Sequence, residues 1–485
     1  MGKVYLIGAG PGDEELITLK AVRKLKDCTA VMYDRLSGTG VLKYLNENCK
    51  IYYCGKEPGC HYKTQDEIND MIVELAKEGH IVGRIKGGDP YIFGRGGEEA
   101  LRLIDEGIEF EVIPGITSPI SVLNYGGIPV THRKIAQSFH VFTGMSAEKL
   151  NVNWKAAAGI GGTLIFLMGF ENLGFISGKL VENGMNESTP CAVVMRGTTA
   201  KQRKVVGTLT DIKEKATEAG LHSPCIIVVG EVVKFNDKLN WFEKKPLFGK
   251  NVCITRTKEQ SKEIREKLID LGTQVTEINS IEIKYTNENL DEFVNKLNDY
   301  DYIVCTSVNG VNSLFDYLNN KNYDIRKIKG TFAAIGPATE EAIKYRGIIP
   351  EIVAEKFVAE SLFDSMKNLV KPGDKIFLPR SKNARPYLVE VLKAEGCIVD
   401  ECYTYETVTG SSQNKDSFDE VDTVIFTSPT TVENMIKIVG LEAIKQKRVI
   451  SIGPITGKAL EKHELSFEIC DEYSTKGVID KLLEK

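Results

Sequence analysis

Long apolar runs are missing from the sequence, because no stretch approaches the ~20 residues that a membrane-spanning helix needs. Proline is scarce, at 16 of 485 residues, and the 44 glycines follow no tripeptide period, which excludes a collagen-like chain. The 11 cysteines form no zinc-binding spacing, so we expect reduced thiols, a cytoplasmic location and no metal. The net charge of -5 gives no excess of basic residues, and we expect neither a nucleic-acid nor a membrane partner.

What the sequence does contain is a globular composition, in a chain too long for one domain of roughly 100 to 200 residues. Pro246 and Gly249 interrupt regular structure between two periodic regions, and 251–255 is typical of a new strand. We therefore predict one domain over 1–245 and another over 250–485.

Short apolar strands alternate with amphipathic helices in the first half, which predicts an α/β fold with parallel or mixed sheets. One helix is predicted over 65–78, where apolar residues line one face and Thr64 with Glu67 forms a capping-box start. The predicted strands are Val4–Ile7, Ala30–Tyr33, Ile81–Ile85, Phe110–Ile113, Phe139–Thr143, Thr163–Met168, Ala192–Met195 and Cys225–Val229.

The second half contains three sequence elements that each occur twice, in the same order and at similar spacing. A solenoid would need three or more copies, so two copies favour a bilobed α/β domain. The repeated pairs are Cys253–Arg256 with Phe377–Arg380, Thr306–Val311 with Thr427–Val432, and Ile335–Thr339 with Ile452–Thr456.

Glycine-rich loops follow several predicted strands of the first half. The loop Gly8–Asp13 has the spacing GxGxG and not the GxGxxG of a dinucleotide site, and alone it fits a plain tight turn equally well. A longer loop, Lys86–Glu99, and the run Pro114–Ser118 end other strands. Several such loops together predict a crevice where backbone approaches a ligand. They lack the Lys-Ser or Lys-Thr pair of a phosphate loop, which argues against a triphosphate nucleotide.

Five runs of the first half form a pattern: VYLIGAGPGD, VMYDRL, GRIKGGDPYIFGRGGEE, VIPGITS and GIPVTHR. These runs resemble the motifs of the tetrapyrrole methylases, among them uroporphyrinogen-III C-methyltransferases, over most of residues 1–235. The resemblance implies two α/β subdomains, unlike a Rossmann fold, with S-adenosyl-L-methionine held in a cleft between them and S-adenosyl-L-homocysteine as product. Cofactor contacts carried over from the family fall on Pro11, Gly87, Gly88, Asp89, Ile92, Thr117, Ser118, Met168, Gly197 and Cys225.

The resemblance also implies catalytic roles. Asp34 in VMYDRL corresponds to the proton acceptor of the family, and Lys56 in YCGKEPG corresponds to its proton donor. A helix N-cap for Asp34 and a solvated loop cation for Lys56 are the plainer alternatives. The implied substrate carries eight carboxylates, which suit guanidinium partners, although each candidate cation also fits an ordinary surface charge. These cations are Arg35, Arg84, Lys86, Arg95, Arg133 and Lys134.

The runs ITRTKEQ, CTSVNGV, AIGPATEEAI, ECYTYE, FTSPTTVENM and SIGPITGKAL resemble uroporphyrinogen-III synthase. The resemblance implies closure of hydroxymethylbilane to uroporphyrinogen III with inversion of ring D, without cofactor, in a domain whose lobe one comprises 250–284 and 407–485 and whose lobe two comprises 285–406. Tyr403 matches the tyrosine that the family places near the departing hydroxyl. Hydroxyl residues at helix N-termini suit carboxylate binding, with plain capping as the alternative. They are Ser307, Thr339, Ser428 and Thr456.

These resemblances predict a bifunctional enzyme of sirohaem and cobalamin precursor synthesis that forms uroporphyrinogen III and methylates it twice, through precorrin-1 to precorrin-2. Family members of the methylase type are commonly dimers, which implies a homodimer through the first half. One alternative is a methyltransferase for another tetrapyrrole. A second is a nicotinamide-dependent oxidoreductase with a non-catalytic bilobed module, because Asp34 lies where such an enzyme has its acidic ribose ligand.

Overall fold

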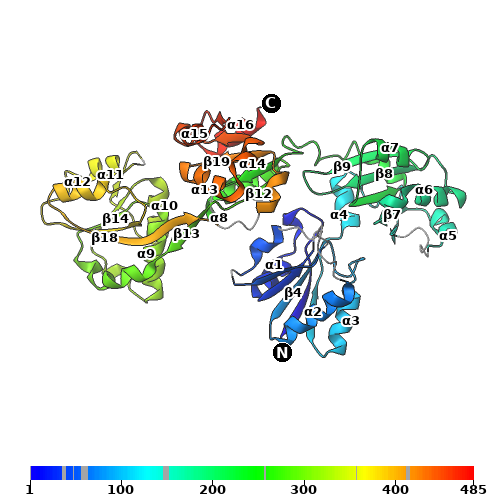
Figure 1. Cartoon of the computed structure of the whole chain (residues 1–485), viewed down its shortest axis with the longest axis horizontal. Helices are drawn as coiled ribbons and strands as arrows, with labels where there is room; N and C mark the ends of the chain where they lie inside the picture. Colours follow the sequence, from blue (N-terminus) through cyan, green and yellow to red (C-terminus); the bar gives the residue numbers. More distant parts are fainter. Residues whose placement is uncertain are drawn as a thin grey trace.

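The computed structural model describes residues 2–34, 40–46, 48–55, 64–145, 152–255, 258–356, 358–410 and 415–484. Its strands form four sheets, two in each half of the chain. Lobe one of the second half lies between lobe two and the first half, whose two subdomains occupy the lower centre and the right of Figure 1. Within the described ranges, no helix is both long and apolar enough to span a bilayer.

The first subdomain is a parallel five-stranded sheet in the order β3-β2-β4-β1-β5. Strands β1 and β4 are almost completely buried, as expected for a parallel sheet covered on both faces. Its strands are β1 Lys3–Gly8, β2 Ala30–Tyr33, β3 Lys50–Tyr53, β4 Ile81–Lys86 and β5 Glu109–Ile113, and its helices are α1 Leu19–Asp27, α2 Gln65–Lys77 and α3 Gly96–Asp105.

Helix α2 confirms the helix predicted from the capping box. The Thr64 Oγ1 accepts a hydrogen bond of 3.2 Å from the Glu67 N–H, and the Thr64 N–H donates to the Glu67 Oε2 at 2.6 Å. Ile68, Ile72 and Leu75 are buried on the face that the sequence predicts. The reciprocal cap therefore fixes where the helix begins, and the apolar face fixes how it packs.

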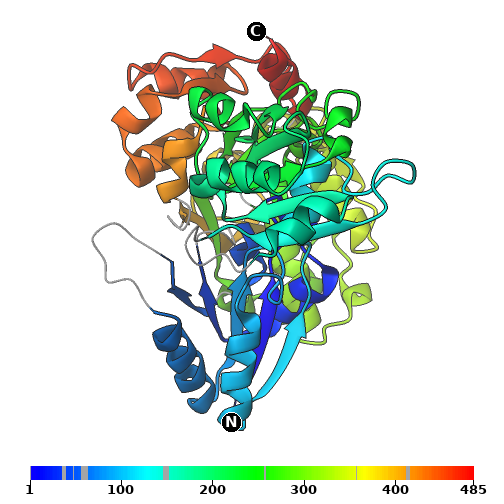
Figure 2. The same ribbon diagram turned by 90° about the vertical axis from the view of Figure 1, so that its right-hand side faces the viewer.

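The second subdomain is a mixed sheet in the order β6-β7-β10-β8-β9, with β6 parallel to β7 and the other pairs antiparallel. Helix α4, Ser118–Tyr125, follows β5 and leads the chain into this subdomain. Figure 2 shows the first subdomain at the N-terminal end of the molecule, with the second subdomain facing the viewer above it. The other elements are β6 Phe139–Thr143, α5 Trp154–Gly159, β7 Thr163–Leu167, α6 Leu173–Glu182, β8 Pro190–Met195, β9 Arg203–Thr208, α7 Ile212–Glu218 and β10 Cys225–Val229.

The segment between the halves is packed against both of them. The Phe242 ring contacts the rings of Tyr125 and Phe248, and Phe242 is buried. The Leu247 N–H donates to the Leu271 carbonyl at 3.0 Å, which ties the segment to the second half. The break predicted between the domains is therefore a structured connection.

The second half has two sheets of similar design, in the orders β12-β11-β19-β20-β21 and β13-β18-β17-β14-β15-β16. The antiparallel pair of β13 and β18 runs between the lobes, as the left of Figure 1 shows. This pair begins at Ile281 and reaches Thr409, so it straddles the lobe boundaries expected at 284/285 and 406/407. The strands are β11 Asn251–Ile254, β12 Gln274–Glu277, β13 Ile281–Tyr285, β14 Tyr302–Cys305, β15 Thr331–Ala334, β16 Ile352–Val353, β17 Lys375–Ser381, β18 Ile398–Thr409, β19 Thr423–Phe426, β20 Arg448–Ser451 and β21 Glu468–Ile469.

The two sequence repeats are interleaved between the lobes. Strands β11 and β12 of the first repeat lie in one sheet with β19 and β20 of the second repeat. Conversely, β17 and β18 of the second repeat pair in the other sheet beside β14 and β15 of the first. The helices are α8 Lys258–Asp270, α9 Val308–Asn320, α10 Pro337–Tyr345, α11 Ala359–Met366, α12 Tyr387–Ala394, α13 Pro429–Val439, α14 Leu441–Lys445, α15 Pro454–Glu461 and α16 Thr475–Leu483.

Candidate active sites

Three loops at the ends of β1, β4 and β5 touch one another through glycines. The Gly10 N–H donates to the Gly88 carbonyl at 3.2 Å, and the Gly88 N–H donates to the Gly10 carbonyl at 2.6 Å. A Cβ on Gly8 would lie 2.5 Å from the Gly115 nitrogen, and a Cβ on Gly115 would overlap the Gly88 carbonyl oxygen. Only glycine permits so close a contact, so these loops pack backbone against backbone, with Gly8 and Gly10 buried and Gly88 and Gly115 half-buried. We call the three packed loops the glycine cradle.

Asp89 braces this cradle. Its Oδ1 accepts a hydrogen bond from the Tyr91 N–H at 2.8 Å, and its Oδ2 accepts one from the Gly115 N–H at 3.0 Å. Pro11 lies in the same cradle between two glycines of positive φ, and Ile92 projects an exposed side chain from the loop after β4. Both oxygens of Asp89 thus have backbone partners, and a ligand would have to share them.

The second subdomain meets the cradle through the loop after β8. The Asp13 N–H donates to the Thr198 Oγ1 at 3.1 Å, and the Tyr125 Oη donates to the Asp13 Oδ2 at 2.7 Å. A Cβ on Gly197 would overlap the Val122 side chain of α4, the helix that begins at Ser118 after Thr117. These contacts connect the predicted cofactor residues of the first subdomain to Gly197 of the second.

Met168 and Cys225 lie at the same end of the second sheet. Antiparallel β7 and β10 pair Leu167 with Ile226, so Met168 follows β7 where Cys225 begins β10. Met168 has a positive φ and an exposed side chain. Burial raises the pKa of the Cys225 thiol to about 12, and its Sγ donates to the His222 carbonyl at 2.9 Å. Cys225 is therefore a neutral, buried thiol, and its backbone is the part that a ligand could contact.

A buried group of charges lies beside Asp34. The Arg84 Nη2 is 3.6 Å from the Asp34 Oδ2, and the Arg84 Nε donates to the Glu99 Oε1 at 3.1 Å. The Lys86 Nζ donates to the same Glu99 oxygen at 2.7 Å. Arg84 and Lys86 are each 4% exposed and Glu99 is 1% exposed. Burial, with the repulsion of Arg84, lowers the pKa of Lys86.

These positions differ from those expected of two substrate-binding cations. Arg84 and Lys86 point into the protein toward Glu99, because buried cations require a buried counter-charge. Sequence reasoning missed Glu99, whose only signal is its place in the run of acids that opens α3. Of the other predicted cations, Arg95 pairs with Glu98 at 2.9 Å, and Arg133 and Lys134 are exposed. Arg35 and Lys56 lie outside the described residues.

Hydroxyl residues occupy equivalent helix starts in the two lobes of the second half. Ser307 caps α9 by accepting a hydrogen bond from the Gly310 N–H at 3.0 Å, and Ser428 caps α13 by accepting one from the Thr431 N–H at 3.3 Å. Thr339 and Thr456 are buried in the first turns of α10 and α15. The capping role that the sequence leaves open is thus present at both serines.

Tyr403 and Tyr405 differ sharply in environment, although two residues apart. Tyr403 is 42% exposed, and its Oη donates to the Glu401 Oε2 at 3.4 Å. Tyr405 is 7% exposed, and its Oη lies 2.8 Å from the Ser307 Oγ. Arg380 pairs with Tyr403 and Ser381 with Tyr405, so β18 holds one extra residue, a bulge that breaks the alternation of its side chains.

Tyr405 lies in a polar cluster that the sequence does not reveal. Burial raises the pKa of Tyr405, while Ser307, Ser381 and Arg380 oppose the shift. Arg380 is itself buried, and its guanidinium pairs with Glu401 at 3.3 Å. The Arg380 Nε is a buried donor without a partner among the described residues. Tyr405 therefore contacts Ser307 at the N-terminus of α9 and lies near the buried guanidinium of Arg380. Tyr403 lies at the edge of this cluster.

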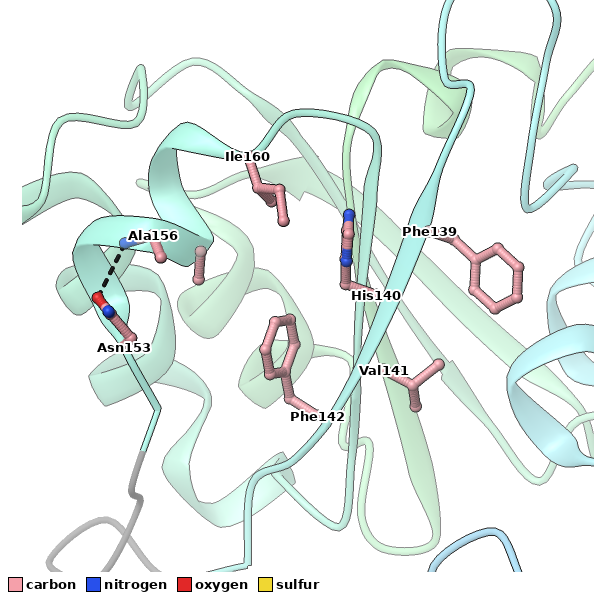
Figure 3. Close-up of a pocket in the computed structure, with 8 residues that line it drawn as sticks. Phe139, His140, Val141, Phe142, Asn153, Ala156 and Ile160 are labelled. Carbon is pink, nitrogen blue, oxygen red and sulfur yellow. Dashed lines mark hydrogen bonds between the residues drawn. The ribbon is translucent and has the colours of Figure 1, made fainter.

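Two pockets lie in the second subdomain and where it meets the second half. One of about 430 Å³ lies between β6 and α5 (Figure 3), where His140 and Phe142 point toward α5 and Phe139 and Val141 point to the other side of the strand. The other, of about 460 Å³, lies where the halves meet, and its lining includes Lys201, Arg203 and Glu420. In the described parts of the chain, no three His, Cys, Asp or Glu side chains are grouped to hold a metal ion.

Two families match the chain, one in each half. Tetrapyrrole (Corrin/Porphyrin) Methylases match residues 3–213, and Uroporphyrinogen-III synthase HemD matches residues 262–480. A relative from Ruminiclostridium josui, "Porphyrin biosynthesis protein HemD", is 36% identical over 493 residues that cover 100% of this chain and 98% of that protein. The chain therefore belongs to the family in which a tetrapyrrole methylase is fused to a uroporphyrinogen-III synthase, and both halves are enzymes.

The first half also matches proteins that consist of a methyltransferase alone. A protein of Methanosarcina barkeri, "S-adenosyl-L-methionine-dependent uroporphyrinogen III methyltransferase", is 48% identical over 241 residues, which are 49% of this chain and 94% of that protein. A crystal structure of a uroporphyrin-III C-methyltransferase from Thermus thermophilus, complexed with S-adenyl homocysteine, is 38% identical. It covers 48% of this chain and 99% of that one, with a TM-score of 0.42.

Proposed function

We propose that the second half closes hydroxymethylbilane to uroporphyrinogen III with inversion of ring D, and that the first half methylates this product twice. The route runs through precorrin-1 to precorrin-2, a precursor of sirohaem and cobalamin. The names of the relatives from Methanosarcina barkeri and Ruminiclostridium josui support both steps. The observation that carries the proposal is the glycine cradle at the ends of β1, β4 and β5, with Asp34 at the same end of the neighbouring strand β2.

The cradle fits S-adenosylmethionine. Cβ atoms on Gly8 and Gly115 would push the packed loops apart, and Gly88 holds a left-handed conformation with no heavy atom nearer than 3.8 Å to the place of a Cβ. When bound, the cofactor supplies a methyl group on an electrophilic sulfonium. The residues proposed to hold it are Pro11, Gly87, Gly88, Asp89, Ile92, Thr117, Ser118, Met168, Gly197 and Cys225.

Asp34 is proposed as the proton acceptor. A pyrrole carbon of the substrate would take the methyl group, and the carbon–sulfur bond of the sulfonium would break to leave a neutral thioether. The cationic ring system would then lose a proton from the adjoining methylene bridge to the Asp34 carboxylate. Asp34 suits this role because it follows β2 and its side chain is only partly buried, with Arg84 beside it. Lys56 remains the proposed proton donor and Arg35 a proposed substrate contact, both on the family resemblance.

The substrate carboxylates are proposed to meet exposed cations of the first half. Arg95 and Arg133 serve best, because each stands on a loop and presents an exposed guanidinium. Lys86 is assigned instead to the buried group around Glu99, where its ammonium balances a carboxylate. We propose further that the first domain spans 1–245, that the synthase spans 250–485 in the two lobes defined above, and that the first half forms a homodimer.

The synthase half is proposed to act mainly by holding the linear substrate in the bent conformation that leads to the type III ring. Ring closure requires the hydroxymethyl oxygen to leave as water, which takes up one proton, while the bent chain is held for attack at ring D. Ser307, Ser428, Thr339 and Thr456 stand at helix starts, where backbone N–H groups favour carboxylates. We propose that Tyr405, and not Tyr403, gives a hydrogen bond to the departing oxygen, because its hydroxyl is buried and lies 2.8 Å from the Ser307 Oγ at the start of α9.

The test supplies the full chain with hydroxymethylbilane and S-adenosylmethionine and separates the products by mass and isomer. We expect a doubly methylated type III tetrapyrrole. Without S-adenosylmethionine we expect uroporphyrinogen III alone. Formation of only the type I isomer would overturn the synthase assignment, and unmethylated uroporphyrinogen III in the complete mixture would overturn the methyltransferase assignment.

A further inference from the structure

Three nitrogen donors converge on a single oxygen of Glu99. The Lys86 Nζ, the Arg84 Nε and the Gln65 Nε2 donate to the Glu99 Oε1 at 2.7, 3.1 and 3.2 Å. The other oxygen, Oε2, is buried and has no hydrogen-bond partner among the described residues. A carboxylate buried this deeply normally accepts hydrogen bonds at both of its oxygens. The fold therefore holds Glu99 in a position where one oxygen accepts no hydrogen bond from the described residues.

Arg84 connects this carboxylate to Asp34. Its Nε donates to Glu99, its Nη1 donates to the Ile85 carbonyl at 3.0 Å, and its Nη2 lies 3.6 Å from the Asp34 Oδ2. A guanidinium is planar and rigid, so two of its edges fix the direction of the third. The side chain of Asp34 therefore contacts a guanidinium whose orientation is fixed by Glu99 of α3.

We propose that Arg84 and Glu99 are positioning residues for methyl transfer: Glu99 orients Arg84, and Arg84 holds the Asp34 carboxylate in the direction from which it accepts the proton. The proposal rests on the function proposed for Asp34. Lys86 supplies a second positive charge, so that Arg84 and Lys86 together balance the two carboxylates of Glu99 and Asp34. The network thus links the helix start after the long glycine loop to the reacting carboxylate.

The competing explanation is that the network only stabilises the fold. A purely structural network would alter stability but would leave the catalytic effect of Asp34 untouched. A double-mutant cycle separates the two explanations, because residues that act through each other give non-additive losses. The variants are Arg84→Met, Asp34→Asn and the double variant, all in the full chain, with kcat, KM and the Kd for S-adenosylhomocysteine measured for each.

We expect Asp34→Asn to lower kcat for methylation about 100-fold. Arg84→Met should lower kcat about 10- to 100-fold by releasing that carboxylate, with KM and the Kd changed less than about twofold. The double variant should match Asp34→Asn to within about twofold. Losses that multiply in the double variant would overturn the proposal while leaving the proposed function intact. An inactive wild-type chain would instead overturn the proposed function, and the role of Arg84 with it.

Glu99 is tested by Glu99→Gln, which keeps the shape but removes the charge. Because two cations would then share the single carboxylate of Asp34, the balanced variant Glu99→Gln/Lys86→Met serves if the single variant fails to fold. Either variant should lower kcat about tenfold or more, since Arg84 is no longer oriented. Wild-type kcat in a folded, balanced variant would exclude Glu99 from the role. Arg102→Met is the matched control on α3, because among the described residues Arg102 forms ion pairs with Asp70 and Glu106 and none with Glu99, and it should keep wild-type kcat.

Discussion

Arg265 on α8 of the synthase half donates a hydrogen bond of 2.7 Å to Glu14, which directly follows the first glycine loop of the methylase half. A second contact joins the Glu420 carboxylate of lobe one to Lys201 at 3.0 Å and to Arg196 at 3.6 Å. These cations flank Gly197 in the second methylase subdomain. Lobe one therefore touches both methylase subdomains, next to the loops proposed to hold the cofactor.

The first prediction concerns this contact. Arg265→Met should weaken the binding of S-adenosylhomocysteine about two- to fivefold, because a partly buried ion pair contributes about 1 kcal/mol and Glu14 is anchored beside the cradle. Isothermal titration measures the change. Arg326→Met is the control, since the exposed Arg326 forms its ion pair with Asp324, two residues away in lobe two. Equal affinities in both variants would show that the contact does not reach the cofactor site.

The second prediction tests the glycine cradle. Gly115→Ala places a Cβ against the Gly88 carbonyl, so the two loops must separate, and we expect S-adenosylhomocysteine to bind at least about tenfold more weakly. Gly97→Ala is a matched control, because a Cβ at this helical glycine meets nothing within 4 Å. It should keep full affinity and add about 0.5–1 kcal/mol to the free energy of unfolding. Normal affinity in Gly115→Ala would remove the cradle from the cofactor site.

The third prediction compares the two tyrosines. Tyr405→Phe removes the hydroxyl beside Ser307 and should slow ring closure of hydroxymethylbilane about tenfold or more, without abolishing it. Tyr403→Phe removes an exposed hydroxyl that only contacts Glu401 and should change the rate less than about twofold. Stopped-flow kinetics of uroporphyrinogen III formation separates the two. The reverse order of effects would restore the role that the sequence resemblance gives to Tyr403.

The fourth prediction concerns alkaline pH. Burial raises the pKa of the thiols of Cys28, Cys225 and Cys253 to about 12, whereas an unfolded cysteine titrates near ~8.5. Between these values the unfolded chain releases protons that the folded chain keeps, so the free energy of unfolding must fall as pH rises. Urea midpoints at pH 8 and pH 10 measure the fall, and Cys28→Ala should make it shallower. A pH-independent midpoint would contradict the buried, neutral thiols.

The sequence predicts most strands of the methylase half because they are short apolar runs that end in glycine loops. It misses β3 and β9, which lie at the edges of their sheets and whose side chains are largely exposed or half-buried, so they lack an apolar signal. The role of Glu99 depends on side chains from β4 and α3 meeting in space, which no spacing reveals. The choice between Tyr403 and Tyr405 depends on a bulge, and a bulge changes which side chain is buried without any mark in the residue types.

The interleaving of the two repeats bears on how such a domain could arise. Strand β11 of the first repeat pairs with β19 of the second, and β17 of the second repeat pairs with β14 of the first. In a half-length ancestor with a single repeat, the first strand would therefore not have belonged to the sheet formed by the later strands. That sheet would have been completed by the first strand of another copy. Two such chains that exchanged their first strands, and were later fused end to end, would give the present order of elements. The strands β13 and β18, which connect the lobes, would then be the former crossover segments.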